Sequence, residues 1–252
     1  MFRRKAKEEA VPPYTRLASI YDYVMRHVDY AHWADYIESL FARHGLSPGR
    51  LLDLACGTGS LALEFWTRGY RISGADGCRE MLDVAEEKVR KAGASIPFDQ
   101  KDLLHIEGLP RAEGVLCLYD SLNYLMTLEE VARALERIWN AVEPGGLFIF
   151  DVCTETNSLR YFRDMTDRER GDGFSYVRRS FYENGVQFNQ FRMHFSDTEE
   201  VVCELHQQRI YPLADIDRAL DASPFTVEGA YDGFGFSPPN ERSDRVHFVL
   251  RA

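Results

Sequence analysis

The residues of this chain best placed to bind a ligand are Asp53, Gly57, Gly59 and Asp76. An apolar run leads into the two glycines, and a helical pattern of apolar residues follows them. This order predicts a buried parallel strand, a tight turn and the start of a helix. Glycine lets the backbone turn sharply and approach a ligand closely, and the free N–H groups at the start of the helix face that ligand. Asp76 ends the next predicted strand, residues 70–75, where a carboxylate can accept hydrogen bonds from the hydroxyls of a ribose.

Asp102 is a third acidic residue predicted to follow a strand. Asp102 and Leu103 come directly after a predicted strand at residues 95–100. The carboxyl ends of parallel strands meet at one edge of the sheet, and ligands bind along that edge in open α/β folds. We therefore expect Asp102 to lie on the same edge as Asp53 and Asp76.

Another set of polar side chains could act on a substrate. We single out Asp120, His194 and His206 as candidate catalytic residues, because carboxylates and imidazoles serve as general acids and bases. Asp120 follows the fourth predicted strand, and the two histidines lie on strands predicted further along the chain. Side chains two apart on a strand share a face, so His206 shares one with Glu204 and Gln208. A solvated sheet face explains that pattern equally well.

Two cofactors fit a glycine turn followed by a ribose carboxylate. Residues 57–62 (Gly-Thr-Gly-Ser-Leu-Ala) match the dinucleotide fingerprint, so a nicotinamide-dependent oxidoreductase is one hypothesis. Asp53 counts against it, because a carboxylate just before the glycines is poorly placed for a pyrophosphate. It suits the cationic amino-acid end of S-adenosylmethionine. A non-catalytic protein that binds S-adenosylmethionine is a further alternative.

Four motifs in order resemble those of class I S-adenosylmethionine-dependent methyltransferases. The segments that carry the resemblance are residues 53–59 (Asp-Leu-Ala-Cys-Gly-Thr-Gly), 74–82, 116–125 and 135–151. The match covers roughly residues 14–152 and the end of the chain. It implies methyl transfer from S-adenosylmethionine, leaving S-adenosylhomocysteine, to a nitrogen or oxygen of an acceptor. Asp120-Ser121-Leu122-Asn123 looks like methyltransferases that act on small molecules.

The resemblance also implies which residues contact the cofactor. Asp53, Gly57 and Gly59 would lie near the methionyl part, Asp76 at the ribose, and Asp102 with Leu103 near the adenine. An N-terminal lid segment would bring Tyr21 to the methionyl end. The whole predicted cofactor set is Tyr21, Asp53, Ala55, Gly57, Gly59, Asp76, Gly77, Met81, Asp102, Leu103 and Tyr119.

Composition limits the partners and the compartment. The 252 residues carry 40 acidic and 30 Lys or Arg side chains, a net charge of -10. That balance argues against non-specific binding to nucleic acid or a membrane surface. The five cysteines are widely spaced and predict neither a disulfide framework nor a zinc site, so no metal is expected. With no signal peptide and no apolar run long enough to span a membrane, we predict a cytoplasmic protein.

The order of predicted elements gives the fold. Strands and helices alternate to residue 152, which predicts a Rossmann-like, mostly parallel seven-stranded sheet with helices on both faces. Residues 46–152 and 212–252 form this core, and residues 1–45 a helical lid after a frayed tail at 1–13. An antiparallel β meander is inserted after the fifth strand, at residues 153–211.

We expect the meander to lie on the acceptor side and to contribute little to holding the cofactor. Its predicted strands are residues 174–182, 186–195 and 201–211, with a turn at Asn184-Gly185. Its many aromatic side chains would form an exposed apolar surface unless another part of the structure buried them. The core, the lid, the substrate or a second subunit of a homodimer could do so.

Overall fold

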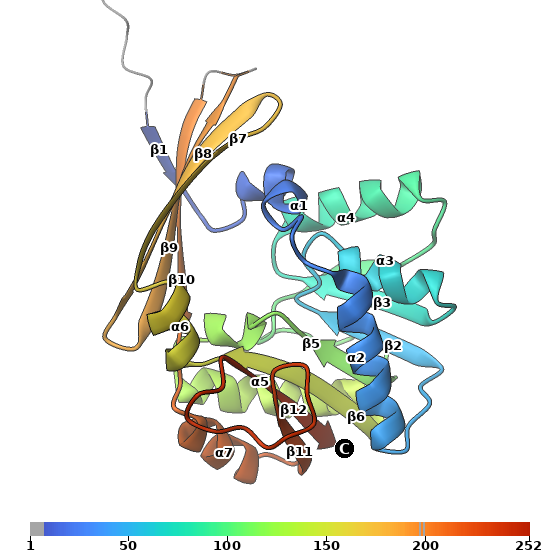
Figure 1. Cartoon of the computed structure of the whole chain (residues 1–252). Helices are drawn as coiled ribbons and strands as arrows, with labels where there is room; N and C mark the ends of the chain where they lie inside the picture. Colours follow the sequence, from blue (N-terminus) through green and yellow to red (C-terminus); the bar gives the residue numbers. More distant parts are fainter. Residues whose placement is uncertain (1–7, 197, 199) are drawn as a thin grey trace, which may run out of the picture.

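A computed structural model describes residues 8–196, 198 and 200–252, and the strands of this part of the chain form two sheets (Figure 1). The larger, which we call the core sheet, has seven described strands in the order β11-β12-β6-β5-β2-β3-β4. Their bounds are β2 (Arg50–Leu54), β3 (Arg71–Asp76), β4 (Phe98–Gln100), β5 (Ala112–Cys117), β6 (Val142–Cys153), β11 (Thr226–Asp232) and β12 (Arg245–Arg251). Neighbours from β4 to β6 are parallel, and β12 is antiparallel to both β6 and β11. The predicted Rossmann-like sheet is confirmed.

Helices cover both faces of the core sheet. On one face α2 (Tyr30–Arg43), α3 (Ser60–Thr67) and α4 (Arg79–Lys91) contribute to one apolar cluster, and on the other α5 (Leu128–Ala141) and α7 (Leu213–Asp221) contribute to a second. The buried side chains of α5 recur every three or four residues, which gives the helix one apolar stripe. A capping box between Thr127 and Glu130 begins it. No helix in the described part of the chain is long and apolar enough to cross a membrane.

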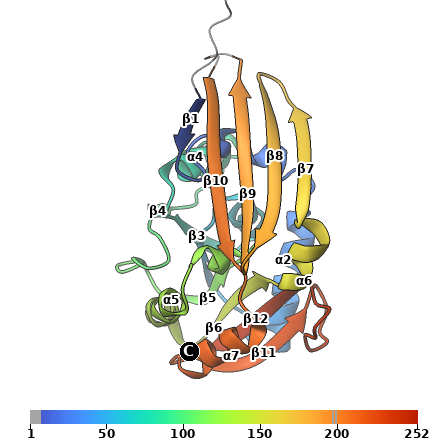
Figure 2. The same ribbon diagram turned by 90° about the vertical axis from the view of Figure 1, so that its left-hand side faces the viewer.

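The second sheet, the meander sheet, stands beyond the carboxyl ends of the core strands (Figure 1) and faces the viewer in Figure 2. Its order is β1-β10-β9-β8-β7. The bounds are β1 (Glu8–Val11), β7 (Asp164–Arg170), β8 (Phe174–Glu183), β9 (Val186–Phe195) and β10 (Glu200–Arg209), with α6 (Glu155–Tyr161) before β7. The three predicted strands and the turn at Asn184-Gly185 are present.

The strand β7 was not predicted from the sequence, and it lies at the edge of the meander sheet. Its residues, Asp-Met-Thr-Asp-Arg-Glu-Arg, are mostly charged, with exposed and half-buried positions alternating. Charged side chains are common on edge strands because they oppose pairing with another chain. The same composition hides the strand from a search for apolar alternation.

The prediction of a frayed tail is wrong for Glu8–Val11. This segment forms β1, which pairs in parallel with β10 from Glu8 opposite Val201 to Val11 opposite Glu204. It satisfies backbone groups along the outer edge of β10. The partner lies far away in the sequence, so no local pattern reveals it. Residues 1–7 lie outside the described residues.

The N-terminal segment fills the space between the two sheets. A 3-10 turn, η1 (Leu17–Ile20), and the short helix α1 (Tyr21–Val24) follow β1. Leu17, Ile20 and Val24 pack against an apolar cluster of the meander sheet formed by Tyr176, Phe191, Met193 and Phe195. The N-terminal segment of this same chain therefore covers Tyr176, Phe191 and Phe195, whereas Phe181 and Phe188 stack on each other outside this cluster and stay half-buried.

Candidate active site

A cavity of about 650 Å³ lies where the core sheet, the N-terminal segment and the meander sheet meet. The predicted cofactor residues that line it are Tyr21, Asp53, Ala55, Gly57, Asp76, Gly77, Met81, Asp102, Leu103 and Tyr119. Asp120 and His206 line it too. The fold therefore brings most of the predicted site to one place, across the gap between the two sheets.

Gly59 is the predicted cofactor residue that does not line the cavity. It begins α3 with φ +70°, and a Cβ there would lie 3.1 Å from the Cβ of Ala85 and from the ring of Phe98. The absent side chain allows α3 to pack closely on α4 and β4. Close packing therefore accounts for glycine at this position, and its place near the methionyl part of the ligand stays a prediction, with Thr58 and Ser60 on either side lining the cavity.

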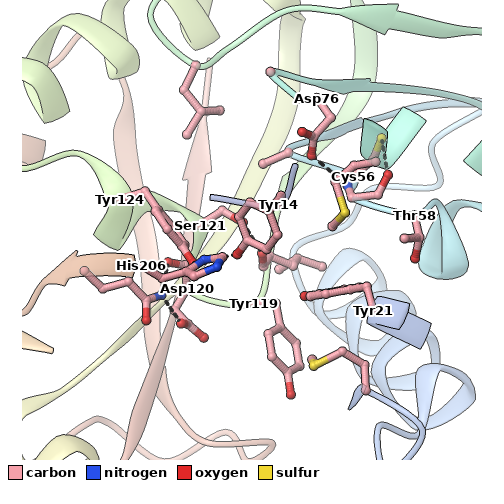
Figure 3. A pocket seen from close by; sticks show the side chains of 18 of the residues that line it. Tyr14, Tyr21, Cys56, Thr58, Asp76, Tyr119, Asp120, Ser121, Tyr124 and His206 are labelled. Atoms are coloured by element: carbon pink, nitrogen blue, oxygen red, sulfur yellow. Dashed lines mark hydrogen bonds between the residues drawn. The ribbon is translucent and has the colours of Figure 1, made fainter. Parts of the chain in front are cut away.

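Asp76 joins the glycine turn to the loop after β3. Its two carboxylate oxygens accept hydrogen bonds of 2.8 Å from the backbone N–H groups of Gly57 and Cys78. Burial raises the pKa of Asp76, and the two N–H donors oppose that shift. The carboxylate is thus fixed at the carboxyl end of β3 and faces the cavity, as Figure 3 shows.

Asp53 is a buried carboxyl group on the cavity wall. Burial, together with the nearby Asp76 carboxylate, raises the pKa of Asp53 to about 7. Among the described residues it forms no ion pair with a basic side chain. An unpaired buried carboxylate is unfavourable unless a cation joins it. This part of the cavity therefore attracts a positive group and repels a pyrophosphate.

Lys88 fastens the N-terminal segment to the glycine turn. Its Nζ donates hydrogen bonds to Asp22 (2.8 Å), Ser60 (2.5 Å) and Thr58 (3.1 Å). The Thr58 hydroxyl also donates to Asp22, at 2.7 Å. Because Asp22 is held in this way, α1 stays over the turn and its neighbour Tyr21 lines the cavity. We call this group the α1 latch.

Tyr119 and Asp120 form a strained turn after β5. Both have positive φ angles, 62° and 53°, which are uncommon for residues with a side chain and cluster at functional sites. The buried Asp151 carboxylate holds the turn by accepting their backbone N–H groups, at 2.6 and 3.0 Å. Arg245 pairs with Asp151 and donates to Asp120 at 2.8 Å.

The Asp120 carboxylate is held from two sides. One oxygen accepts from Arg245 and the other from Gln208 Nε2 at 2.5 Å. Burial raises the pKa of Asp120, whereas the Arg245 guanidinium opposes the shift. Both oxygens are occupied, so the side chain is suited to positioning and to electrostatic attraction.

A chain of hydrogen bonds runs from the cavity to a buried carboxylate. The hydroxyls of Tyr14 and Tyr124 lie 2.5 Å apart, and the Tyr124 hydroxyl lies 3.2 Å from His206 Nδ1. His206 Nε2 lies 3.1 Å from Glu204, which also accepts the backbone N–H groups of Tyr14, Arg16 and Leu17. Figure 3 shows His206, Tyr124 and Tyr14 side by side, across the cavity from Asp76. We call Glu204, His206, Tyr124 and Tyr14 the relay.

Glu204 is the charged end of the relay. Burial alone would raise its pKa, but the hydrogen bonds from His206 and from the backbone lower the pKa of Glu204 overall. It is therefore an ionised, buried carboxylate beside an imidazole.

Comparison with known proteins agrees with this geometry. The family described as "Methyltransferase domain" matches residues 51–146. YqeM of Bacillus subtilis is 29% identical over 240 residues, covering 93% of this chain and 95% of that protein. A glycine/sarcosine N-methyltransferase of Halorhodospira halochloris is 32% identical, covering 69% of this chain and 72% of its own length. The chain belongs to the S-adenosylmethionine-dependent methyltransferases.

A solved structure shows the same fold. The S-adenosylmethionine-dependent methyltransferase from Clostridium acetobutylicum superposes with a TM-score of 0.81 at 24% identity, covering 94% of this chain and 98% of that one. The cavity of the chain described here is suited to S-adenosylmethionine, the cofactor of the family. The buried Asp53 carboxyl group can attract a cation from within this cavity, and a Cβ on Gly57 would lie 3.2 Å from Met81 Cε, so glycine leaves room for the close packing of Met81.

The structure places His194 away from the site of this methyltransferase. Gln187, Asn189 and Phe191 of β9 line the cavity, so the even-numbered positions of that strand point to the opposite face. His194 is one of these and is half-buried on the outer face. The prediction that His194 faces the acceptor is wrong, because the register of β9 decides the face and the sequence alone did not fix it.

Several residues lining the cavity of the methyltransferase were missed. They are Tyr14, Tyr124, Arg178, Gln187, Asn189 and Arg245. Tyr124 lies inside the fourth-strand motif, so its place after β5 was a usable signal. Arg178 and Asn189 belong to strands whose partners and register only the folded chain sets.

Proposed function

We propose that this methyltransferase moves the methyl group of S-adenosylmethionine to a nitrogen of a small-molecule amine. The observation that carries the proposal is the shared cavity, in which the cofactor residues face the relay. Its volume of about 650 Å³ is in the range of pockets that bury small ligands. The relative from Halorhodospira halochloris, a glycine/sarcosine N-methyltransferase, supports an amine acceptor.

We assign the cofactor contacts as follows. Asp53 and the turn at Ala55 and Gly57 take the methionyl part, with Tyr21 over it from the lid. Asp76 accepts the ribose hydroxyls. Gly77, Met81, Asp102 and Leu103 line the adenine part, and Tyr119 lies at the acceptor side of the methyl group. When bound, S-adenosylmethionine supplies an electrophilic methyl group on a sulfonium.

The relay has a role that the acceptor nitrogen requires. An ammonium has no free electron pair, so an amine acceptor must lose a proton before it can attack a methyl group. His206, with the ionised Glu204 behind it, can accept a proton that reaches it through the hydroxyl of Tyr124. Asp120, held by Arg245 and Gln208, attracts and orients the cationic acceptor before the proton leaves.

Methyl incorporation tests the function. Purified protein is incubated with methyl-labelled S-adenosylmethionine and a metabolite extract, and labelled products are separated and identified by mass spectrometry. We expect a labelled amine and an equal amount of S-adenosylhomocysteine. Bound S-adenosylmethionine with no product from any extract would favour the non-catalytic binding protein. Release of a nicotinamide nucleotide from the purified protein would favour the oxidoreductase.

We further infer a cytoplasmic enzyme, supported by five cysteines that are all free thiols. A homodimer through the outer face of the meander sheet stays a prediction. Light scattering during size-exclusion chromatography measures it. A monomeric mass would exclude the dimer and leave the methyltransferase proposal intact.

A further inference from the structure

Arg178 is a cation on the meander wall of the cavity without a carboxylate partner among the described residues. Its Nε and Nη2 donate to Asn189 Oδ1 at 3.2 and 2.8 Å, and its Nε also donates to Ser180 Oγ at 3.1 Å. Both partners are neutral. Within the described part of the chain, no Asp or Glu oxygen lies within ion-pair distance of the guanidinium.

Aromatic rings surround the Arg178 guanidinium. Its central carbon lies 5.1 Å from the ring centroid of Phe162 and 5.6 Å from that of Phe191. Burial lowers the pKa of Arg178, but an arginine stays protonated at neutral pH. The side chain is therefore a partly desolvated positive charge, and its Asn189 and Ser180 contacts fix it toward the cavity.

The carboxylates of the described residues around Arg178 form no ion pair with it, although the charge of Asp167 attracts the guanidinium from a greater distance. Glu204 belongs to the same cross-strand row as Arg178, two strands away, and accepts hydrogen bonds from His206 and from three backbone groups. Asp167 is opposite Arg178 on the edge strand β7, half-buried and outside ion-pair distance. Asp120 pairs with Arg245 instead.

We propose that Arg178 is the anion subsite of the acceptor site, and that the acceptor carries a carboxylate besides its amine. This inference rests on the proposed function and names the class of its substrate. In this arrangement the carboxylate of the acceptor binds the Arg178 guanidinium, and the ammonium of the acceptor lies beside Asp120. A guanidinium binds a carboxylate through two parallel hydrogen bonds, and Arg178 has donors left for them beyond those given to Asn189 and Ser180.

A carboxylate suits this wall better than a phosphate. Arg178 provides a single positive charge, because the other basic group on the meander wall, His206, is paired with Glu204. One unpaired charge balances a monoanion. A dianionic phosphate would add an uncompensated negative charge to a cavity that already holds the carboxyl groups of Asp53 and Asp76, neither of which has a basic partner within the described part of the chain.

The first test measures anion binding directly. Protein complexed with S-adenosylhomocysteine and labelled with nitrogen-15 arginine is titrated with sodium acetate and, separately, with inorganic phosphate. The Nε–H resonance of Arg178 is assigned by its loss in Arg178→Met. We expect acetate to shift it saturably, and Arg179→Met, which removes the neighbouring exposed charge on the opposite face, to leave that response unchanged. Absence of a saturable shift with either anion would overturn the subsite, and tighter binding of phosphate would overturn the carboxylate.

The second test uses the enzyme's own acceptor. Products labelled from S-adenosylmethionine in a metabolite extract are passed over an anion exchanger at alkaline pH, where an amine is uncharged. We expect the labelled product to be retained, and Arg178→Met to lower kcat/KM for it about 10- to 100-fold with unchanged S-adenosylmethionine affinity. Arg179→Met should match the wild type. An unretained product, or full activity of Arg178→Met, contradicts the inference. No labelled product at all would contradict the proposed function instead, and the acetate titration would still decide on Arg178.

Discussion

At the scale of single residues, the cofactor half of the cavity is governed by two carboxylates in different states. Asp76 is stabilised by two backbone N–H groups, whereas Asp53 is buried beside it and has a pKa of about 7. The first is suited to hydroxyl groups of fixed position, and the second to a cation. Each role can be tested by a single substitution.

Asp76→Ala should weaken S-adenosylmethionine binding about 10- to 100-fold, because hydrogen bonds to a charged group are each worth about 1.5–3 kcal/mol. Isothermal titration calorimetry measures the dissociation constant. Asp99→Ala is the matched control, since Asp99 is exposed on the neighbouring strand β4. An unchanged dissociation constant in the folded Asp76→Ala protein would remove Asp76 from the site.

The raised pKa of Asp53 predicts a pH dependence with a definite sign. A carboxyl group whose pKa is raised on folding binds protons more tightly in the folded state, so its contribution to stability is lost as the pH rises through about 7. A cationic ligand binds the ionised form. S-adenosylmethionine should therefore bind more tightly, and raise the melting temperature more, at pH 8 than at pH 6. In Asp53→Asn the two shifts should be equal, and a persisting difference would assign the effect to another group.

In the reaction proposed above, the Tyr124 hydroxyl links the acceptor to His206, whose Nδ1 lies 3.2 Å from it. Tyr124→Phe should lower kcat about 100-fold, within the range of general base catalysis, and leave S-adenosylmethionine affinity unchanged. The loss should shrink as the pH rises, because the acceptor amine then needs less help to lose its proton. Tyr161→Phe, at an exposed tyrosine, is the control. A loss of kcat that is independent of pH would indicate a structural role.

At the scale of elements, the N-terminal segment is held from both sides. The α1 latch ties it to the glycine turn, and Glu204 of β10 accepts three of its backbone N–H groups. The expectation that the meander contributes little to holding the cofactor therefore needs revision. Removing the meander would free the lid that brings Tyr21 to the cavity, so loss of cofactor affinity is now the expected result.

Asp22→Asn should loosen the α1 latch. It removes the negative charge that Lys88 pairs with, at an exposed aspartate, and weakens the Thr58 contact. Hydrogen exchange of residues 17–24 should become faster, and S-adenosylmethionine should dissociate several-fold faster. Glu87→Gln, which breaks exposed pairs on the same helix as Lys88, should change neither rate. Unaltered exchange in Asp22→Asn would show that the apolar cluster alone holds the lid.

At the scale of the whole molecule, the core sheet and the meander sheet line one cavity from opposite sides. The core sheet presents the carboxyl ends of its strands, and the meander sheet presents one face that carries both polar cavity residues and the apolar cluster under the N-terminal segment, which lies between the two sheets (Figure 1). The whole chain carries a net charge of -10. Such a charge repels polyanions and leaves the approach of a small acceptor open.

The charge predicts that nucleic acid is not an acceptor. Added bulk RNA or DNA should neither incorporate label nor inhibit methylation of the small-molecule acceptor. Filter binding of labelled nucleic acid at low salt measures the same property. Methylation of RNA that falls steeply as salt rises would reveal phosphate contacts through counterion release and would contradict the small-molecule acceptor.

The sequence by itself predicted one wall of the cavity, the wall at the carboxyl ends of the parallel strands. Asp53, Gly57 and Asp76 are read from short strand–turn patterns, and parallel strands bring their carboxyl ends to one edge whatever the rest of the chain does. Only the tertiary structure decided which meander residues form the opposite wall. The register of the meander strands places His206 and Arg178 on the face toward the cavity and His194 on the opposite face. A register shift by one residue would move each of these side chains to the other face of the sheet. That register depends on partners far away in the sequence, as does the pairing of β1 with β10.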